Sequence, residues 1–528
     1  MTATLAAPLA ENPYDRVHYE GVPIPQTHPD RLAAAAALRG FSPPSPDTAR
    51  ILELGCGDGT NLVTMAYYLP AATFTGVDLS ASNVARARSL AGRLGLGNVR
   101  FEERDIAAVG EDLGDFDYVL AHGVLSWVPE AVEARMWEIF RDRLAPSGVG
   151  FVSYNTHPGW QIRRIVRDLL RSKVGAVPPG PTRYEATRAL SGAISGAADA
   201  QNPWGSLLRG EFLAVMDYPD HYLEHEYFSP ESRAFYFGEI LARAASHGLS
   251  VVGELTAPEF GTGNVAAHRE RLSASGISGN ALEECVDIVC GRQFRASVLC
   301  HTAAAAASAR GPAAPRYYAA PVQPLAEEPL LREGRKLVFR LPTGVEIGTE
   351  SAVLKGALLA LSDAWPLGRT ATELFDLACA ALRERGLALP GESREADADK
   401  LREDLELLVA AGHIELRLRQ IRFPHRVDAR PRLHALSRLL LEEGGYVATP
   451  RHEIVALSRH GRAIASACDG TRDLDEVVSE VTPAFMADPP AAAAEGEPAL
   501  DPEDLKRALP GYVASVVMGL ARSGAFAD

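Results

Sequence analysis

The sequence of 528 residues contains only six cysteines, and no two of them form a CxxC pair or stand at zinc-finger spacing with histidine. This scarcity favours reduced thiols in a cytoplasmic protein and gives no sign of a metal site. No stretch of about 18 apolar residues occurs, so we expect no membrane-spanning helix. The N-terminal residues lack a basic segment before their short apolar run, which argues against a signal peptide.

An excess of positive charge is also missing, because the formal net charge is −15. A chain this acidic does not hold nucleic acid by bulk charge, and we expect no nucleic-acid partner. The length and the hydrophobic content of 47% are enough for two to four domains, each with its own core.

Short apolar runs alternate with helical spacing in residues 50–156. This order predicts a parallel sheet with helices on both faces, the Rossmann-like α/β class. The expected strands are 50–55, 73–80, 98–106, 116–123 and 148–156. The expected helices are 60–69, 81–94 and 130–145.

The remainder of the chain has a different character. Long helical patterns dominate 161–300, including one at 281–300, with a strand-like run at 250–255. An Ala/Pro-rich linker follows at 302–321. Beyond it, the order helix, helix, helix, strand over 356–419 indicates an α+β, winged-helix-like region, with a disordered loop at 486–504 and a last helix at 503–523.

These patterns predict five parts of the chain. They are an N-terminal segment (1–47), a Rossmann-like α/β domain (48–160), a mostly helical region (161–305), a linker (306–334) and a C-terminal winged-helix-like region (335–528).

The strongest chemical signal is the run ELGCGDGT, Glu53 to Thr60, between an expected strand and an expected helix. Gly55, Gly57 and Gly59 let the backbone approach a ligand where a side chain would clash. A glycine loop alone is weak evidence, but here it stands in a strand–turn–helix context.

Two acidic positions accompany this loop. Asp78 ends the second expected strand, where a carboxylate can accept hydrogen bonds from both hydroxyls of a ribose. Capping of the next helix is the alternative, although Ser80 is better placed for it. Asp105 follows the third strand, where it can accept from an adenine amine while Ile106 offers its backbone N–H; a surface acid is the alternative.

The loop has the form GxGxG and is preceded by Glu53, whereas a dinucleotide site uses GxGxxG to seat a pyrophosphate. The combined pattern resembles class I methyltransferases and implies S-adenosylmethionine as the cofactor. By this resemblance the cofactor pocket is lined by Glu53, Gly55, Cys56, Gly57, Asn61, Asp78, Leu79, Asp105, Ile106 and His122.

The fourth expected strand ends in AHGVLSWVP, in place of the Asn-Pro-Pro-Tyr motif of amide and base methylases. His122 is a structural histidine or a ligand contact, and Trp127 suits packing more than catalysis. Tyr154, Asn155 and His157 follow at the end of the fifth strand, where substrates enter such sheets. A helix cap formed by Asn155 or Thr156 is the alternative.

Four motifs occur together: residues 14–33, ELGCGDGTN, AHGVLSWVP and SYNTHPGW. This combination resembles the bacterial protein lysine methyltransferases similar to those that modify rickettsial outer membrane protein B. The resemblance implies that 1–47 caps the active site and that 48–160 is a class I methyltransferase domain. It also implies that 161–305 is a helical methyltransferase regulatory domain, with the regulatory part at about 215–305, and that 335–528 is a C-terminal winged-helix-like domain. It also implies a protein acceptor that presents lysine ε-amines, and it leaves a homodimer open.

Residues that can position the acceptor amine are Tyr19, Gln26, His28, Tyr154 and Asn155. We expect Tyr19, Trp127, Tyr154 and Trp160 to wall its channel, although packing alone explains each of them. Three other functions stay open: a small-molecule methyltransferase with a helical lid, an RNA methyltransferase, and a non-enzymatic scaffold that binds S-adenosylmethionine.

Overall fold

The computed structural model describes residues 12–255, 265–307, 315–326, 330–389, 393–421, 427–489 and 501–527, together with residues 391 and 423. The chain forms two compact units. The N-terminal unit comprises Met1–Val22 and Ala35–Pro312, and the C-terminal unit comprises Pro23–Ala34 and Ala313–Asp528. Across these described ranges, no helix is both long enough and apolar enough to cross a membrane.

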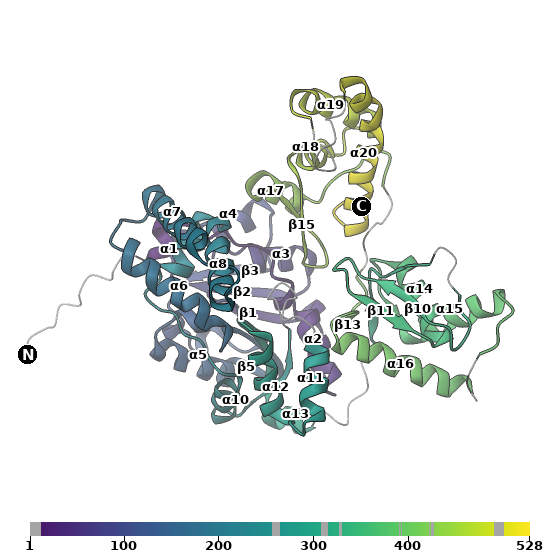
Figure 1. The fold of residues 1–528 in the computed structure, drawn as a ribbon, viewed down its shortest axis with the longest axis horizontal. Helices are drawn as coiled ribbons and strands as arrows, with labels where there is room; N and C mark the ends of the chain where they lie inside the picture. Colours follow the sequence, from purple (N-terminus) through teal and green to yellow (C-terminus); the bar gives the residue numbers. More distant parts are fainter. Residues whose placement is uncertain are drawn as a thin grey trace, which may run out of the picture. The chain divides into compact units, whose positions relative to one another are not determined.

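The N-terminal unit is built on a seven-stranded sheet of order β3-β2-β1-β4-β5-β7-β6 (Figure 1). Strands β1 to β5 are parallel, and β7 runs antiparallel between β5 and β6. The strands are β1 (Arg50–Leu54), β2 (Thr73–Asp78), β3 (Val99–Glu103), β4 (Phe116–Ala121), β5 (Leu144–Asn155), β6 (Leu249–Glu254) and β7 (Phe294–His301).

Helices α3 (Thr60–Tyr68), α4 (Ala81–Arg93) and α5 (Glu130–Arg143) follow β1, β2 and β4. The five predicted strands and three predicted helices of this region are confirmed, and so is the Rossmann-like α/β class. Strand β1 is buried at every residue except its first, Arg50, because both faces of a parallel sheet are covered. Trp137 and Phe140 on α5 are buried in the core.

The prediction of one helix over 281–300 is wrong. Helix α12 (Gly279–Cys290) ends at Gly291, whose φ of +59° is a left-handed conformation that glycine adopts without strain. Strand β7 then lies between two neighbours, and Arg295 to Cys300 are all buried. Periodicity cannot distinguish a strand covered on both faces from a buried helix, and this is why the pattern misled.

A helical insertion separates β5 from β6 in sequence. Its helices are α6 (Gly159–Val174), α7 (Pro181–Ala197), α8 (Pro203–Asp217), α9 (Asp220–Tyr222) and α10 (Phe237–Ser246), with the π-helix η6 (Leu223–Tyr227) after α9. Figure 1 shows α6, α7 and α8 grouped close to the short helix α1 (Pro13–Arg16). Helix α11 (Val265–Ala274) precedes α12.

The C-terminal unit contains small sheets and helices. The expected order helix, helix, helix, strand is confirmed by α14 (Ala352–Ala364), α15 (Ala371–Glu384), α16 (Arg394–Ala410) and β13 (Glu415–Arg417). The last helix is confirmed as α20 (Pro502–Ser523). The remaining elements are β8 (Tyr317–Ala319), β9 (Gln323–Pro324), β10 (Leu337–Arg340), β11 (Glu346–Thr349), β12 (Arg369–Thr370), α17 (Ala435–Gly444), β14 (Tyr446–Ala448), β15 (Ile454–Ala456), α18 (Arg459–Ala467) and α19 (Leu474–Ala487).

The predicted linker at 302–321 contains regular secondary structure. Helix α13 (Thr302–Ala307) and strand β8 lie within 302–321, and β8 is the middle strand of the sheet β12-β8-β13. Most of the predicted loop at 486–504, residues 490–500, lies outside the described residues.

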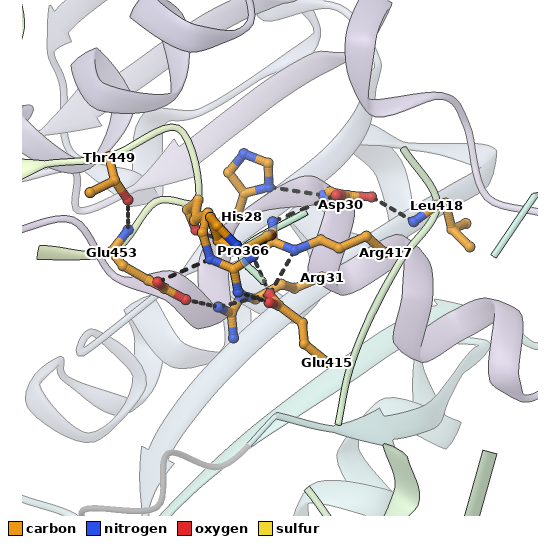
Figure 2. Close-up of polar contacts among 10 residues, drawn as sticks. His28, Asp30, Arg31, Pro366, Glu415, Arg417, Leu418, Thr449 and Glu453 are labelled. Carbon is orange, nitrogen blue, oxygen red and sulfur yellow. Dashed lines mark hydrogen bonds and ion pairs between the residues drawn. The ribbon is translucent and has the colours of Figure 1, made fainter. Parts of the chain in front are cut away.

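Residues 23–34 join the C-terminal unit through a buried cluster of charges (Figure 2). Asp30 accepts a hydrogen bond from the backbone N–H of Leu418 at 2.9 Å and lies 3.5 Å from the guanidinium of Arg417. Glu415 pairs with Arg31 at 3.0 Å, with Arg417 and with Arg451. Three guanidinium groups around one carboxylate hold the pKa of Glu415 well below its usual range.

Candidate active site

The glycine loop lies at the carboxyl end of β1, as predicted. Gly55 and Gly57 have φ values of +68° and +54°, which favour glycine over other residues. A Cβ at Gly55 would lie 2.6 Å from a methyl group of Val124, whereas a Cβ at Gly57 would meet nothing within 4 Å. A side chain at position 55 would therefore clash with the loop that follows β4, whereas the backbone at Gly57 faces open space.

Asp78, at the end of β2, organises this loop. Its carboxylate accepts hydrogen bonds from the backbone N–H groups of Gly57 and Ser80, both at 2.9 Å. Burial raises the pKa of Asp78. The cap of α4 is Ser80, whose Oγ accepts from the N–H of Asn83, so the alternative role of Asp78 as the helix cap does not apply.

Glu53 is buried beneath the loop. Its Oε1 accepts a hydrogen bond from Asn61 at 2.7 Å, while its Oε2 is buried and has no hydrogen-bond partner among the described residues. Burial raises the pKa of Glu53 to about 8, and the charges of Asp78 and Asp58 add to this rise. An unpaired buried carboxylate oxygen at this position is suited to a cationic ligand group.

The end of β3 places Asp105 and Ile106 as the sequence predicts. Asp105 precedes a short 3-10 helix, η3 (Ile106–Ala108), and accepts from the N–H of Ala107 at 2.8 Å. Ile106 is buried. Leu79, directly after Asp78, is 60% exposed, which leaves an apolar side chain uncovered beside the carboxylate.

His122 follows β4, and its Nδ1 lies 3.2 Å from the hydroxyl of Ser153. Burial lowers the pKa of His122 to about 4, so the imidazole is neutral at pH 7. The ring packs near Phe151 and Phe294. Cys56 is buried, and burial raises the pKa of its thiol well above the usual value, so it is not a thiolate at neutral pH.

The segment 12–22 is attached to the loops at this edge of the sheet. Asp15 accepts hydrogen bonds from the Ser80 hydroxyl at 2.5 Å and from the Ser82 N–H at 3.1 Å. Asp58, in the glycine loop, accepts from the N–H of Gly21 at 2.8 Å and lies 3.3 Å from His18 Nε2. Asp15, His18 and Asp58 stand within the motifs that the sequence highlights, but their roles in holding this segment were not predicted.

The same segment reaches the helical insertion. The ring of Tyr14 stacks on His225, with centroids 4.2 Å apart, and Tyr19 meets His221 and His225 edge to face. His225 Nε2 lies 2.7 Å from the carbonyl oxygen of Val17. Tyr19 is thus placed at the edge of the sheet that carries the glycine loop.

The other residues predicted to position the acceptor, Tyr154, Asn155 and His28, differ in their surroundings. Tyr154 is buried, and its hydroxyl is hydrogen bonded to Ser297 on β7, which is sufficient to explain it as a core residue. Asn155 has a buried side-chain Nδ2 without a hydrogen-bond partner in the described part of the chain. His28 lies in the C-terminal unit, fully buried, with its ring 5.4 Å from that of His452.

The alternative in which Asn155 or Thr156 caps a helix is wrong, because the N-cap of α6 is Pro158 and no side chain bonds to the helix end. Thr156 instead donates its hydroxyl to the carbonyl oxygen of Phe235. Trp127 and Trp160 contact each other edge to face at 5.8 Å. For Trp127 this contact agrees with a packing role.

Three ranges of the chain match models of known protein families. Residues 51–148 match the model of a methyltransferase domain, 219–301 match a "predicted methyltransferase regulatory domain", and 429–525 match the "PKMT, C-terminal winged helix domain". The chain therefore contains a methyltransferase domain on a Rossmann-like sheet, followed by a regulatory domain and a winged helix domain.

Two proteins of Rickettsia prowazekii are similar in sequence. The chain is 33% identical to the uncharacterized protein RP789 over 292 residues, which are 55% of this chain and 53% of RP789. It is 31% identical to the uncharacterized protein RP028 over 232 residues, which are 44% of this chain and 93% of RP028. The chain belongs to the family of RP028, and it spans about half the length of RP789.

The fold is also that of a solved structure, PKMT2 from Rickettsia typhi in complex with AdoHcy. The TM-score is 0.79 and the identity 21%, and the match covers 96% of this chain and 99% of PKMT2. The likeness extends over both units and confirms the predicted fold class, including the C-terminal winged-helix region.

The residues present fit S-adenosylmethionine. The unpaired Oε2 of Glu53 suits the ammonium group of the methionine part. The carboxylate of Asp78 stands at the strand end where ribose hydroxyls bind in such folds. The exposed side chain of Leu79 and the carboxylate of Asp105 suit the face and the amine of an adenine ring.

We expect Glu53→Gln to raise stability in alkaline solution while weakening cofactor binding. The folded state raises the pKa of Glu53 to about 8, so the protonated form stabilises the protein fully below the unfolded pKa of about 4.3, and that contribution is lost as the pH rises through about 8. Glutamine stays neutral. The variant should therefore melt above the wild type at pH 9 but with it at pH 5, and should bind cofactor about 10- to 100-fold more weakly.

Thermal melts at the two pH values and calorimetry with S-adenosylhomocysteine measure these effects. Glu185→Gln is the control, because Glu185 is an exposed residue of α7. An equal melting difference at pH 5 and pH 9 would show that the charge of Glu53 is not its cause.

Proposed function

We propose that the protein transfers methyl groups from S-adenosylmethionine to lysine ε-amines of a protein substrate. The observation that carries this proposal is the match of residues 429–525 to the PKMT C-terminal winged helix domain, in the same chain as a methyltransferase domain. The fold likeness to PKMT2 over 96% of the chain supports it.

The chemistry needs alignment more than acid catalysis. The cofactor supplies a methyl group on a sulfonium, and its leaving group is neutral. In this chain Asp78 would hold the ribose and the glycine loop would fix the backbone near the reacting atoms. Asp15 and His18 tie segment 12–22 over the same loops, where it can limit the access of water.

The acceptor must present a lone pair, and a free lysine has a pKa near 10.4. Removal from water beside a positive charge lowers the pKa of an amine. Tyr19 and Asn155 remain the predicted residues best placed to orient it, since Tyr19 is on segment 12–22 and Asn155 has an unpaired amide nitrogen. The cytoplasmic location, the homodimer and the five-part division of the chain remain predictions.

Mass spectrometry of the reaction products tests the proposed function. We expect incubation with isotopically labelled S-adenosylmethionine and lysate fractions to place the label on lysine side chains of protein, with a rate that rises with pH as more amine loses its proton. Asp78→Ala in the same fractions controls for label that arrives from other enzymes. Label confined to a metabolite, to RNA or to other side chains would refute the proposal.

A further inference from the structure

The π-helix η6 presents two glutamates that differ in their surroundings. Glu224 is buried and paired: its carboxylate lies 2.9 Å from a guanidinium nitrogen of Arg183 and accepts from the hydroxyl of Tyr184. Glu226 is half-buried, and its carboxylate makes no hydrogen bond or ion pair with any residue that the structure describes. A π-helix widens the turn and is found preferentially at functional sites.

Tyr14 and Tyr19 contact His225, the residue before Glu226: the ring of Tyr14 stacks on it at 4.2 Å, and that of Tyr19 meets it edge to face at 5.6 Å. The negative charge of Glu226 raises the pKa of Tyr14, of Tyr19 and of Tyr222, in each case in addition to the larger effect of burial. The hydroxyl of Tyr222 accepts a hydrogen bond from Arg163 at 3.2 Å. The hydroxyls of Tyr14 and Tyr19 have no hydrogen-bond partner within the described ranges. One carboxylate and two phenols therefore have their polar atoms unused.

Glu226 and the two tyrosines, Tyr14 and Tyr19, lie near the expected cofactor site. Asp78 also raises the pKa of Tyr14, so this ring lies within electrostatic range of both Asp78 and Glu226. Asp15, the next residue, is hydrogen bonded to Ser80 and Ser82 in the turn after β2. The helix α1 thus fixes the aromatic group against the strand end that is expected to hold the ribose.

We propose that Glu226, walled by Tyr14 and Tyr19, is the site that binds the acceptor amine and takes its proton. This inference rests on the proposed lysine acceptor. A lysine ammonium is attracted both by a carboxylate and by the faces of aromatic rings, and a half-buried carboxylate without a partner provides the counter-charge. The aliphatic part of a lysine side chain is suited to the same apolar walls.

The proton transfer balances. The Glu226 carboxylate accepts one proton from the –NH₃⁺ group, which leaves a neutral amine and a carboxylic acid. The amine lone pair then forms the N–C bond while the C–S bond of the donor methyl breaks, with its electron pair remaining on sulfur. The product is a methylammonium, and Glu226 returns its proton to solvent.

The electrostatics permit this role near neutral pH. Burial raises the pKa of Glu226 to about 7, against the opposing effect of two arginines on α6. A base with a pKa close to the working pH is effective in proton transfer. The titratable and charged groups that act on Glu226 or respond to it are Tyr14, Tyr19, Arg163, Arg167, Tyr222 and Tyr227.

The test compares Glu226→Gln with the exposed control Glu185→Gln, using poly-L-lysine or the lysate protein on which the wild type deposits methyl-lysine. We expect Glu226→Gln to bind S-adenosylhomocysteine within twofold of the wild type, to melt at a similar temperature, and to lose at least 100-fold in kcat/KM. The rise of the wild-type rate through pH 7 should be absent from Glu226→Gln and partly restored in Glu226→Asp.

The outcomes separate the two proposals. If the wild type forms methyl-lysine and Glu226→Gln retains its rate within threefold with the same pH profile, Glu226 is not the amine site and the proposed function stands. If the wild type places no label on lysine of either acceptor, the lysine function fails, and the amine site fails with it.

Discussion

Asp78→Ala should weaken the binding of S-adenosylmethionine by about 10²- to 10⁴-fold. A charged hydrogen bond contributes about 1.5–3 kcal/mol, and the carboxylate is expected to accept from two ribose hydroxyls. Asp78 also accepts from the N–H groups of Gly57 and Ser80, so its loss leaves the glycine loop without its anchor. The expected loss is therefore larger than that of any other single change at the site.

Calorimetry with S-adenosylhomocysteine measures the effect. Asp78→Asn keeps an oxygen acceptor without the charge and should lose less affinity. Asp117→Ala removes a carboxylate that pairs with Arg50 near the start of β4, at the opposite end of the strands, and should bind as the wild type does. Unchanged affinity in Asp78→Ala would remove this residue from the cofactor site.

Glu415→Ala should destabilise the C-terminal unit by about 3–5 kcal/mol, because it leaves three guanidinium groups with only Asp30 and Glu453 as counter-charges in a buried cluster. Glu415 pairs with the guanidinium groups of Arg31 and Arg417, which Figure 2 labels, and with that of Arg451. Arg417 and Arg451 are almost fully buried. No other carboxylate among the described residues pairs with all three. Urea unfolding followed by hydrogen exchange in residues 23–34 should report the change.

The contribution of Glu415 to stability should decrease in acid. The pKa of Glu415 is depressed in the folded state, so its contribution is present above the unfolded pKa of about 4.3 and is lost as the pH falls below it. Glu415→Gln should therefore show a flatter stability profile in acid than the wild type.

Glu346→Ala provides the matched control in the same unit. Glu346 pairs with Arg340 at 2.7 Å on an exposed hairpin, and its loss should cost less than about 1 kcal/mol. Equal destabilisation by the two variants would mean that burial of the cluster around Glu415 contributes nothing.

The parts of the molecule that could be predicted from the sequence are those with local causes. The run RILELG, the glycine loop and Asp78 lie within one strand–turn–helix–strand unit, where backbone conformation and short-range hydrogen bonds fix the arrangement. The cap of α4 at Ser80 follows from an equally local rule.

The parts that could not be predicted depend on distant partners. His225 contacts the carbonyl of Val17 across 208 residues, and no local pattern marks this pairing. Glu226 lies in a five-residue π-helix, for which the helical period gives no signal. Strand β7 owes its conformation to the neighbours that cover it rather than to its own alternation.

The exchange of residues 23–34 into the C-terminal unit has a consequence for synthesis. Asp30 is translated 388 residues before Leu418, whose N–H it accepts, so at typical rates it waits roughly 20 to 80 s for its partner. Residues 35–312, in contrast, contain all seven strands of the large sheet and can close that sheet while the ribosome is still working. The early segment must therefore remain available during this interval, and premature burial of its charged side chains elsewhere would trap the nascent chain.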